Sequence, residues 1–175
     1  MHKIKLIATL LIPVLCIFTL LYAVFTAGGT IEFALIDSDQ WFSSRWVDAN
    51  APAPLSQRLI YTGIWLTPIA FGLFAVWSAI RVMILIRKGI LFDDRTSRHI
   101  RLAGIGTSAS GFADFLANLI TPTVMSWTNP SGAEPLRWYF DSEAGGLILC
   151  GGAFYLIGWI LTEAKRLADE NESFV

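Results

Sequence analysis

Four long apolar stretches, separated by shorter polar segments, dominate the pattern of the chain. They cover residues 4–27, 59–86, 100–125 and 144–164. Each is close to or above the roughly 20 residues that a helix needs to cross a bilayer, and a backbone in lipid must satisfy its own hydrogen bonds, which favours helices. The pattern therefore predicts an all-α membrane protein: one domain, residues 1–175, with four transmembrane helices in a bundle and a cytoplasmic tail at residues 165–175.

The first apolar stretch has two interpretations. It follows the basic residues Lys3 and Lys5, as in a signal peptide, and the small residues 26–29 after it could form a cleavage site. A signal peptide has a shorter apolar core, of about 7–15 residues, whereas this stretch is long enough to cross a bilayer. We expect it to be retained as a helix, because an even number of spans brings both basic chain ends to one side.

The Lys and Arg residues are distributed unevenly between the two sides that four spans would create. Of the 13 in the chain, those on one side are Arg45, Arg58 and Arg137. The others lie at the chain ends, in residues 87–101 or close to them. Short segments rich in Lys and Arg stay in the cytoplasm. The distribution predicts a protein of the cell membrane with both termini and residues 87–101 in the cytoplasm.

Two short runs on the opposite side have the character of β-strands. Residues 30–35 alternate imperfectly between polar and apolar, and residues 136–140 are rich in aromatic side chains. We expect a small two-stranded β element on the outer face, supported by the bundle because two strands alone are marginally stable. Tryptophans near the span ends are expected at the headgroup level. On this side they are Trp41, Trp46, Trp127 and Trp138.

Composition supports the membrane assignment and narrows the chemistry. The chain is 54% hydrophobic and 15% charged, whereas soluble domains have about 25% charged residues. Cys16 and Cys150 lie inside apolar stretches, where we expect packing rather than a disulfide or a metal site. The sequence contains no hydrolase, nucleotide-binding or metalloprotease motif. We therefore expect no enzyme activity, no cofactor, no metal and no direct binding of nucleic acid.

Asp114 is the acidic residue that we expect deepest in the bilayer. It lies about 13 residues into the third stretch, or ~20 Å along a helix, which predicts a position near the midplane. Asn118 follows one turn later, and Tyr155 is expected at a similar depth as a hydrogen-bond donor to Asp114. An ionised carboxylate in lipid is costly, so the cluster should face other helices. It either holds the helices in register or relays protons or ions, and both interpretations stay open.

Glycines predict close packing of the fourth stretch. They are Gly145, Gly146, Gly151, Gly152 and Gly158. Glycines spaced by seven residues keep one side of a helix small, which lets another helix approach closely. Packing inside the bundle and packing against a second copy, as a homo-oligomer, are both compatible with this pattern.

Charged residues on the cytoplasmic side form two candidate surfaces. Asp93 and Asp94 are placed to cap a helix whose first turns carry arginine at every third position. These arginines are Arg95, Arg98 and Arg101. Glu163 and Glu170 lie on a polar continuation of the fourth helix. The two surfaces are suited to contact the lipid bilayer or to dock a cytosolic protein.

Two segments resemble a known bacterial membrane family. They are Lys88-Gly89-Ile90-Leu91-Phe92, followed by the arginine-bearing entry to Gly104, and Glu163-Ala164-Lys165-Arg166-Leu167-Ala168-Asp169-Glu170-Asn171. Both are similar to segments of the family named domain of unknown function 2975, and the similarity covers nearly the whole chain. The resemblance implies four membrane helices without an established activity. Members are often encoded next to a small helix-turn-helix regulator, which implies such a regulator as a partner.

These features lead to two hypotheses for the function. The first is a non-enzymatic regulator or scaffold that binds a cytosolic partner through its charged cytoplasmic side. The alternative is a small transporter or channel-like protein that uses Asp114 and Asn118 as its polar site. Removal of the charged tail distinguishes them, because a transporter should keep its function without the tail.

Overall fold

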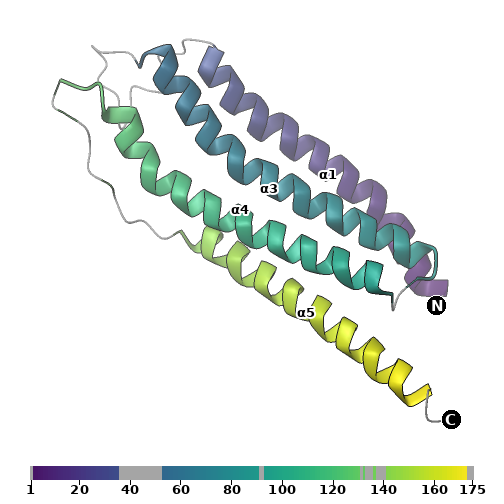
Figure 1. Cartoon of the computed structure of the whole chain (residues 1–175). Coiled ribbons are helices and arrows are strands. Elements are labelled where there is room, and N and C mark those ends of the chain that lie inside the picture. Colours follow the sequence, from purple (N-terminus) through teal and green to yellow (C-terminus); the bar gives the residue numbers. More distant parts are fainter. Residues whose placement is uncertain are drawn as a thin grey trace.

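All regular structure in the described part of the chain is α-helical. The computed structural model describes residues 2–35, 53–90, 93–130, 132, 136 and 141–172. Its helices are α1 (His2–Leu35), α3 (Leu55–Arg87), α4 (Asp94–Ser126) and α5 (Ser142–Glu172) (Figure 1). The all-α class predicted from the sequence is confirmed, and each helix is longer than the apolar stretch that predicted it.

The helices pack in chain order. α1 packs on α3, α3 on α4, and α4 on α5, with successive helices running in opposite directions (Figure 1). The start of α1, the connection from α3 to α4 and the end of α5 lie at one end of the bundle, which we call the terminal end. The end of α1, the start of α3 and the end of α4 form the loop end. α5 is shifted along the bundle: it begins beside the middle of α4 and runs past the other helices at the terminal end (Figure 1).

The connection between α3 and α4 shows how local chemistry ends one helix and starts the next. Gly89 has a φ of 85°, a left-handed conformation that favours glycine, and its backbone N–H donates to the carbonyl oxygen of Ile86 at 2.9 Å. Asp93 then caps α4, because its carboxylate accepts a hydrogen bond from the backbone N–H of Arg95 at 3.4 Å. The predicted capping role of Asp93 is therefore confirmed.

Three of the four helices are long and apolar enough to cross a membrane. These candidate spans are Ile4–Glu32, Leu55–Arg87 and Ser142–Asn171. α4 is equally long, at 33 residues, but it carries many Ser, Thr and Gly residues and begins with two charged turns. The predicted membrane character is thus supported for three stretches. Residues 100–125 do form a helix, as predicted, but one of more polar composition.

The predicted strand at residues 30–35 is wrong. These residues continue α1 to its end at Leu35. The hydroxyl of Thr30 donates to the carbonyl oxygen of Thr26 at 2.7 Å, one helical turn earlier. A continued helix gives each backbone N–H a partner within the same segment, whereas an isolated pair of strands is marginal. Leu136 is not in a strand, and the rest of the second run, residues 137–140, lies outside the described residues.

Small residues bring α5 close to α4. A Cβ atom added to Gly104 of α4 would lie 2.6 Å from the carbonyl oxygen of Gly151, so only glycine fits there. Gly158 is equally enclosed by the backbone of α4. In contrast, Gly146 and Gly152 have open space beside them. Of these glycines of α5, Gly151 and Gly158 therefore pack inside the bundle, whereas Gly146 and Gly152 do not.

Candidate functional site

The polar pair predicted on the third stretch is present on α4. The side-chain amide of Asn118 donates to the backbone carbonyl oxygen of Asp114 at 3.1 Å and lies 3.4 Å from its carboxylate oxygen Oδ2. Both side chains are half-buried. Residues four apart are neighbours on a helix, so this contact is local to α4. It positions the carboxylate but does not connect α4 to another helix.

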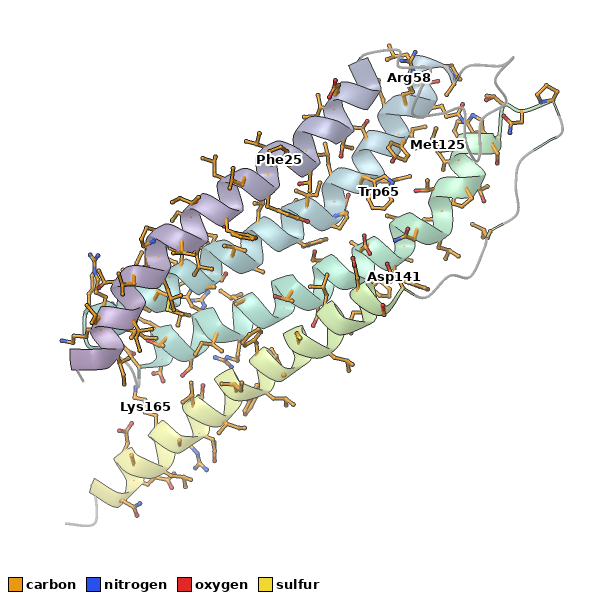
Figure 2. The ribbon with its side chains drawn as sticks, turned by 180° about the vertical axis from the view of Figure 1, so that it is seen from behind. Phe25, Arg58, Trp65, Met125, Asp141 and Lys165 are labelled. Carbon is orange, nitrogen blue, oxygen red and sulfur yellow. The ribbon has the colours of Figure 1, made fainter. Side chains whose placement is uncertain are left out.

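Asp114 lies beside the start of α5. One turn before it, Gly111 packs against the backbone of Ala144, with 2.7 Å between a Cβ added at Gly111 and the carbonyl oxygen of Ala144. The carboxylates of Asp141 and Glu143 are close enough for their charges to act on Asp114. Figure 2 shows Asp141 next to the middle of α4. Negative charge from the start of α5 therefore acts on Asp114.

The structure does not bring Tyr155 to Asp114. The backbone of Tyr155 packs against Gly104, which is ~15 Å from Asp114 along the axis of α4. Its hydroxyl accepts a hydrogen bond from the indole nitrogen Nε1 of Trp159 at 3.3 Å. Tyr155 therefore belongs to a different level of the bundle from the Asp114–Asn118 pair.

Polar and aromatic side chains of α1 and α3 also approach α4 near this pair. The indole nitrogen of Trp65 donates to the hydroxyl of Thr121 at 3.2 Å, and the ring of Tyr61 lies 6.1 Å from that of Trp65 (Figure 2). The phenol of Tyr22 on α1 lies within range of the charge of Asp114. This side of α4 is suited to hydrogen bonding between helices. In the described ranges, no three His, Cys, Asp or Glu side chains come together to hold a metal ion.

Gln57 is a buried polar residue that the sequence did not reveal. Its side chain is 0% exposed, and Nε2 donates to the carbonyl oxygens of Val124 and Met125, each at 2.6 Å. Its Oε1 accepts from the hydroxyl of Thr128 at 3.0 Å. The last carbonyls of a helix have no partner within it, so Gln57 of α3 caps the end of α4. Its place just before an apolar stretch gave no signal of this role.

At the terminal end, α5 is tied to α4 and then continues alone. Nζ of Lys165 forms an ion pair with Asp94 at 3.1 Å. On the same helix Arg166 pairs with Glu163 and, at 2.7 Å, with Glu170. These side chains are exposed, so each pair contributes little to the stability of the whole protein. Together they support the helical form of a charged segment that no other helix covers (Figure 1).

The three arginines at the start of α4 do not form one surface. The Cγ atom of Arg101 packs against Gly158, and its guanidinium lies 6.0 Å from the ring centre of Trp159 on α5. Arg95 and Arg98 are exposed instead. Arg101 therefore takes part in the contact between α4 and α5, whereas Arg95 and Arg98 are available to other molecules.

A second tryptophan and arginine pair lies on α3 and is met by a residue of α4. The guanidinium of Arg81 lies 5.2 Å from the ring centre of Trp77, and the imidazole of His99 meets the same ring edge-on at 5.9 Å. Burial lowers the pKa of His99, and the positive charges of Arg81 and Arg98 lower it further. The imidazole is therefore neutral near physiological pH.

The chain matches no family model, no curated protein and no solved structure. The resemblance to the family named domain of unknown function 2975 stays a prediction from the sequence. The function is therefore argued from the geometry of the chain itself.

Proposed function

We propose that this chain is a multi-pass protein of the cell membrane and that it acts as a non-enzymatic scaffold or regulator. In this proposal all four helices cross the bilayer, both chain ends lie in the cytoplasm, and a small cytosolic protein docks at the terminal end. The observation that carries the proposal is the extension of α5 beyond the bundle as a charged helix (Figure 1).

The apolar parts of α1 and α5 support one position of the bilayer along the bundle. On α1 the apolar run ends about one turn beyond Tyr22, which lies near Asp114. On α5 it begins at Ala144, which packs against Gly111. From there to Glu163 the helix covers ~28 Å, close to the ~30 Å thickness of the hydrocarbon layer. We therefore assign Asp114 to the outer headgroup region, where water can hydrate the carboxylate, rather than to the midplane.

The place of α4 in the bundle explains how a more polar helix could cross the bilayer. It lies between α3 and α5, so its polar side chains can bond to protein instead of facing lipid. The hydroxyl of Ser110 donates to the carbonyl oxygen of Pro68 on α3 at 2.9 Å. The hydroxyl of Ser108 donates to the carbonyl oxygen of Ile148 on α5 at 3.1 Å. These bonds support α4 as a fourth span, although its composition is more polar than that of the other three helices.

Reporter fusions test this topology. A reporter that is active only in the cytoplasm should work when it is placed after Val175 or within residues 93–98, because these positions flank the basic segments. A reporter that is active only outside should work within residues 132–133. An outside signal from residues 93–98 would overturn the four-span topology.

The extension of α5 supplies the proposed docking surface. From Lys165 to Glu172 the helix adds ~10 Å beyond its last tie to α4. The side chains of residues 166–171 are exposed, and they include Leu167, at 49%, as well as both signs of charge. A surface of a few hundred Å² of this mixed character suits a weak or transient partner. The resemblance described above suggests a helix-turn-helix regulator.

Affinity capture from solubilised membranes tests the docking surface. We compare the intact chain with a truncation after Arg166, which keeps the ion pair between Lys165 and Asp94. The control is Arg58→Glu, a charge reversal at the loop end. We expect one soluble protein to co-purify with the intact chain and the control, and to be lost with the truncation. The same soluble proteins at equal yield in all three samples would overturn the proposal.

The transporter alternative has less support. Its polar site would be the Asp114–Asn118 pair, but the contact within this pair is local to α4 and lies where the apolar part of α5 begins. A relay needs groups that continue across the membrane. A pH-dependent ion flux in proteoliposomes that Asp114→Asn abolishes would favour the transporter over the scaffold.

A further inference from the structure

We propose that the terminal-end halves of α3 and α4 form a binding site for the headgroup of an anionic phospholipid in the cytoplasmic leaflet. The site consists of Trp77 and Arg81 of α3 with Arg98 and His99 of α4. It rests on the membrane location proposed above but is independent of the cytosolic partner. A failure of partner capture would therefore not contradict this lipid site, and a failure of lipid binding would not contradict the proposed cytosolic partner.

Trp77 holds the cluster together. The imidazole of His99 meets the indole ring edge-on at 5.9 Å, and the guanidinium of Arg81 lies 5.2 Å from the ring centre. The indole is 46% exposed, so the cluster lies on the surface of the bundle rather than in its core. One ring therefore fixes a cation from α3 and an imidazole from α4 in a single accessible place.

No described carboxylate forms an ion pair that would compensate the positive charge of the cluster. Arg81 and Arg98 are both exposed, and both lie close enough to His99 for their charges to act on it. Within residues 2–35, 53–90, 93–130 and 141–172, no carboxylate forms an ion pair with either guanidinium. Two positive charges that both act on one imidazole also repel each other, and a bound anion weakens this repulsion. Arginine is also the side chain whose fork of N–H groups best matches a phosphate.

His99 adds a hydrogen-bond donor. Its Nδ1 atom is buried without a partner among the described residues, whereas Nε2 is neither buried nor bonded. A neutral imidazole whose Nδ1 has no acceptor places its hydrogen best on Nε2. Nε2 then offers an N–H group beside the two guanidinium groups. Three donors of this kind are suited to the oxygen atoms of a phosphate.

The surroundings of the cluster favour a lipid over a soluble anion. Phe74 stacks on Trp77, with 6.0 Å between ring centres, and both rings are partly exposed. They provide an apolar surface next to the cations, as an acyl chain next to its headgroup requires. On the other side of α4, Arg101 and Trp159 form a similar pair. Tryptophans and arginines of this kind mark the edge of the hydrocarbon layer, and the long side chains of Arg81 and Arg98 can extend their guanidinium groups to the lipid phosphates.

Native mass spectrometry of the full chain in neutral detergent tests the site. The probes are phosphatidylglycerol and phosphatidylcholine with identical acyl chains. We expect the intact chain to retain phosphatidylglycerol preferentially, and the double variant Arg81→Gln/Arg98→Gln to bind it more than about tenfold more weakly, because charge-assisted hydrogen bonds are lost. The control Arg87→Gln/Arg95→Gln makes the same charge change with two exposed arginines of the same end and should change binding less than about threefold.

Further arms distinguish the ligand classes. Trp77→Leu keeps all the charges but removes the ring that positions them, so it should also weaken phosphatidylglycerol binding. This variant replaces the double variant in the test if the double variant does not fold. Equal losses of phosphatidylglycerol binding in the double variant and in the control Arg87→Gln/Arg95→Gln would contradict a defined binding site. Displacement of the lipid by an equal concentration of free glycerol phosphate would overturn the lipid in favour of a soluble anion. Displacement of the lipid by a polyglutamate peptide at the same concentration would overturn the lipid as ligand in favour of an acidic protein segment.

Discussion

Helices α1 and α4 are nearly equal in length but opposite in composition and surroundings. α1 is the most apolar helix, and between Ile4 and Glu32 its one buried residue is Ala8. Its large side chains are exposed, up to 75% for Phe25. α4 is the least apolar helix and has the most buried residues, many of them Gly, Ser or Thr. In a soluble protein the apolar helix would be the buried one.

This difference shows which properties place a helix inside the bundle. When the surroundings are lipid, burying an apolar side chain gains little, because acyl chains are equally apolar. Close backbone approach and hydrogen bonds between helices decide the packing instead. α4 has both, through Gly104 against α5 and through the hydroxyls of Ser108 and Ser110. The described residues of α1 make one bond of this kind, a long hydrogen bond of 3.4 Å that the carbonyl oxygen of Thr30 accepts from the hydroxyl of Thr62.

The largest expected effect comes from filling the contact between α4 and α5. A Cβ at Gly151 would lie 2.5 Å from the carbonyl oxygen of Gly104, so Gly151→Leu forces the helices apart. We expect a loss of about 3 kcal/mol in the free energy of unfolding. Unfolding by added dodecyl sulfate in mixed micelles, followed by circular dichroism, measures it. The matched control is Gly152→Leu, whose position opens to free space and should change stability by less than about 0.5 kcal/mol. Equal losses of stability in Gly151→Leu and Gly152→Leu would contradict the packing of α5 against α4.

The second effect tests the cap at the loop end of α4. Gln57→Leu removes the donors to the carbonyl oxygens of Val124 and Met125 and leaves them buried without a partner. We expect a loss of about 2 kcal/mol, the usual cost of an unsatisfied buried polar group. The same unfolding titration measures the loss. Ser56→Ala, at an exposed neighbouring position, is the control, and a Gln57→Leu variant as stable as this control would show that the cap is dispensable.

The sequence predicted the helices well because long apolar stretches have few alternatives in lipid. It also predicted the cap at Asp93 and the polar continuation of α5, which depend on residues close together in the chain. It failed at residues 30–35, where imperfect alternation suggested a strand although α1 simply continues. A short alternating run fits a helix end as well as a strand, so only the neighbouring helical segment distinguishes them.

The candidate site was harder to predict because it depends on the shift between helices. Tyr155 was expected beside Asp114 from equal depths in two spans, but α5 is displaced so that Tyr155 lies level with Gly104. This displacement follows from the spacing of glycines on both helices, and a pattern on one helix does not show its register with another. The role of Gln57 depends on its contact with the end of α4 at Val124, which lies 67 residues away in the sequence.

A smaller effect is expected at Asp114. Asp114→Asn keeps a side chain of the same shape, and Asn118 can still donate to the backbone carbonyl oxygen of residue 114. We therefore expect stability to change by about 1 kcal/mol or less, as for loss of one weak polar contact. The titration described above measures this change. The control Asn118→Leu should cost more than Asp114→Asn, because it removes the donor itself. A loss above about 3 kcal/mol for Asp114→Asn would indicate that the carboxylate bonds to a further group.

The smallest effect is expected on α1. Phe25 is 75% exposed, so Phe25→Ala exchanges contacts with lipid or detergent for other contacts of the same kind. We expect a change of less than about 0.5 kcal/mol, whereas the same substitution in a packed core costs about 3–5 kcal/mol. Met125→Ala, at a position that is 0% exposed, is the contrasting control and should show a core-like loss. A loss above about 2 kcal/mol for Phe25→Ala would mean that protein covers this face of α1. Repeating the titration at tenfold lower protein concentration would then identify a second copy, because a homo-oligomer loses stability on dilution whereas a monomer does not.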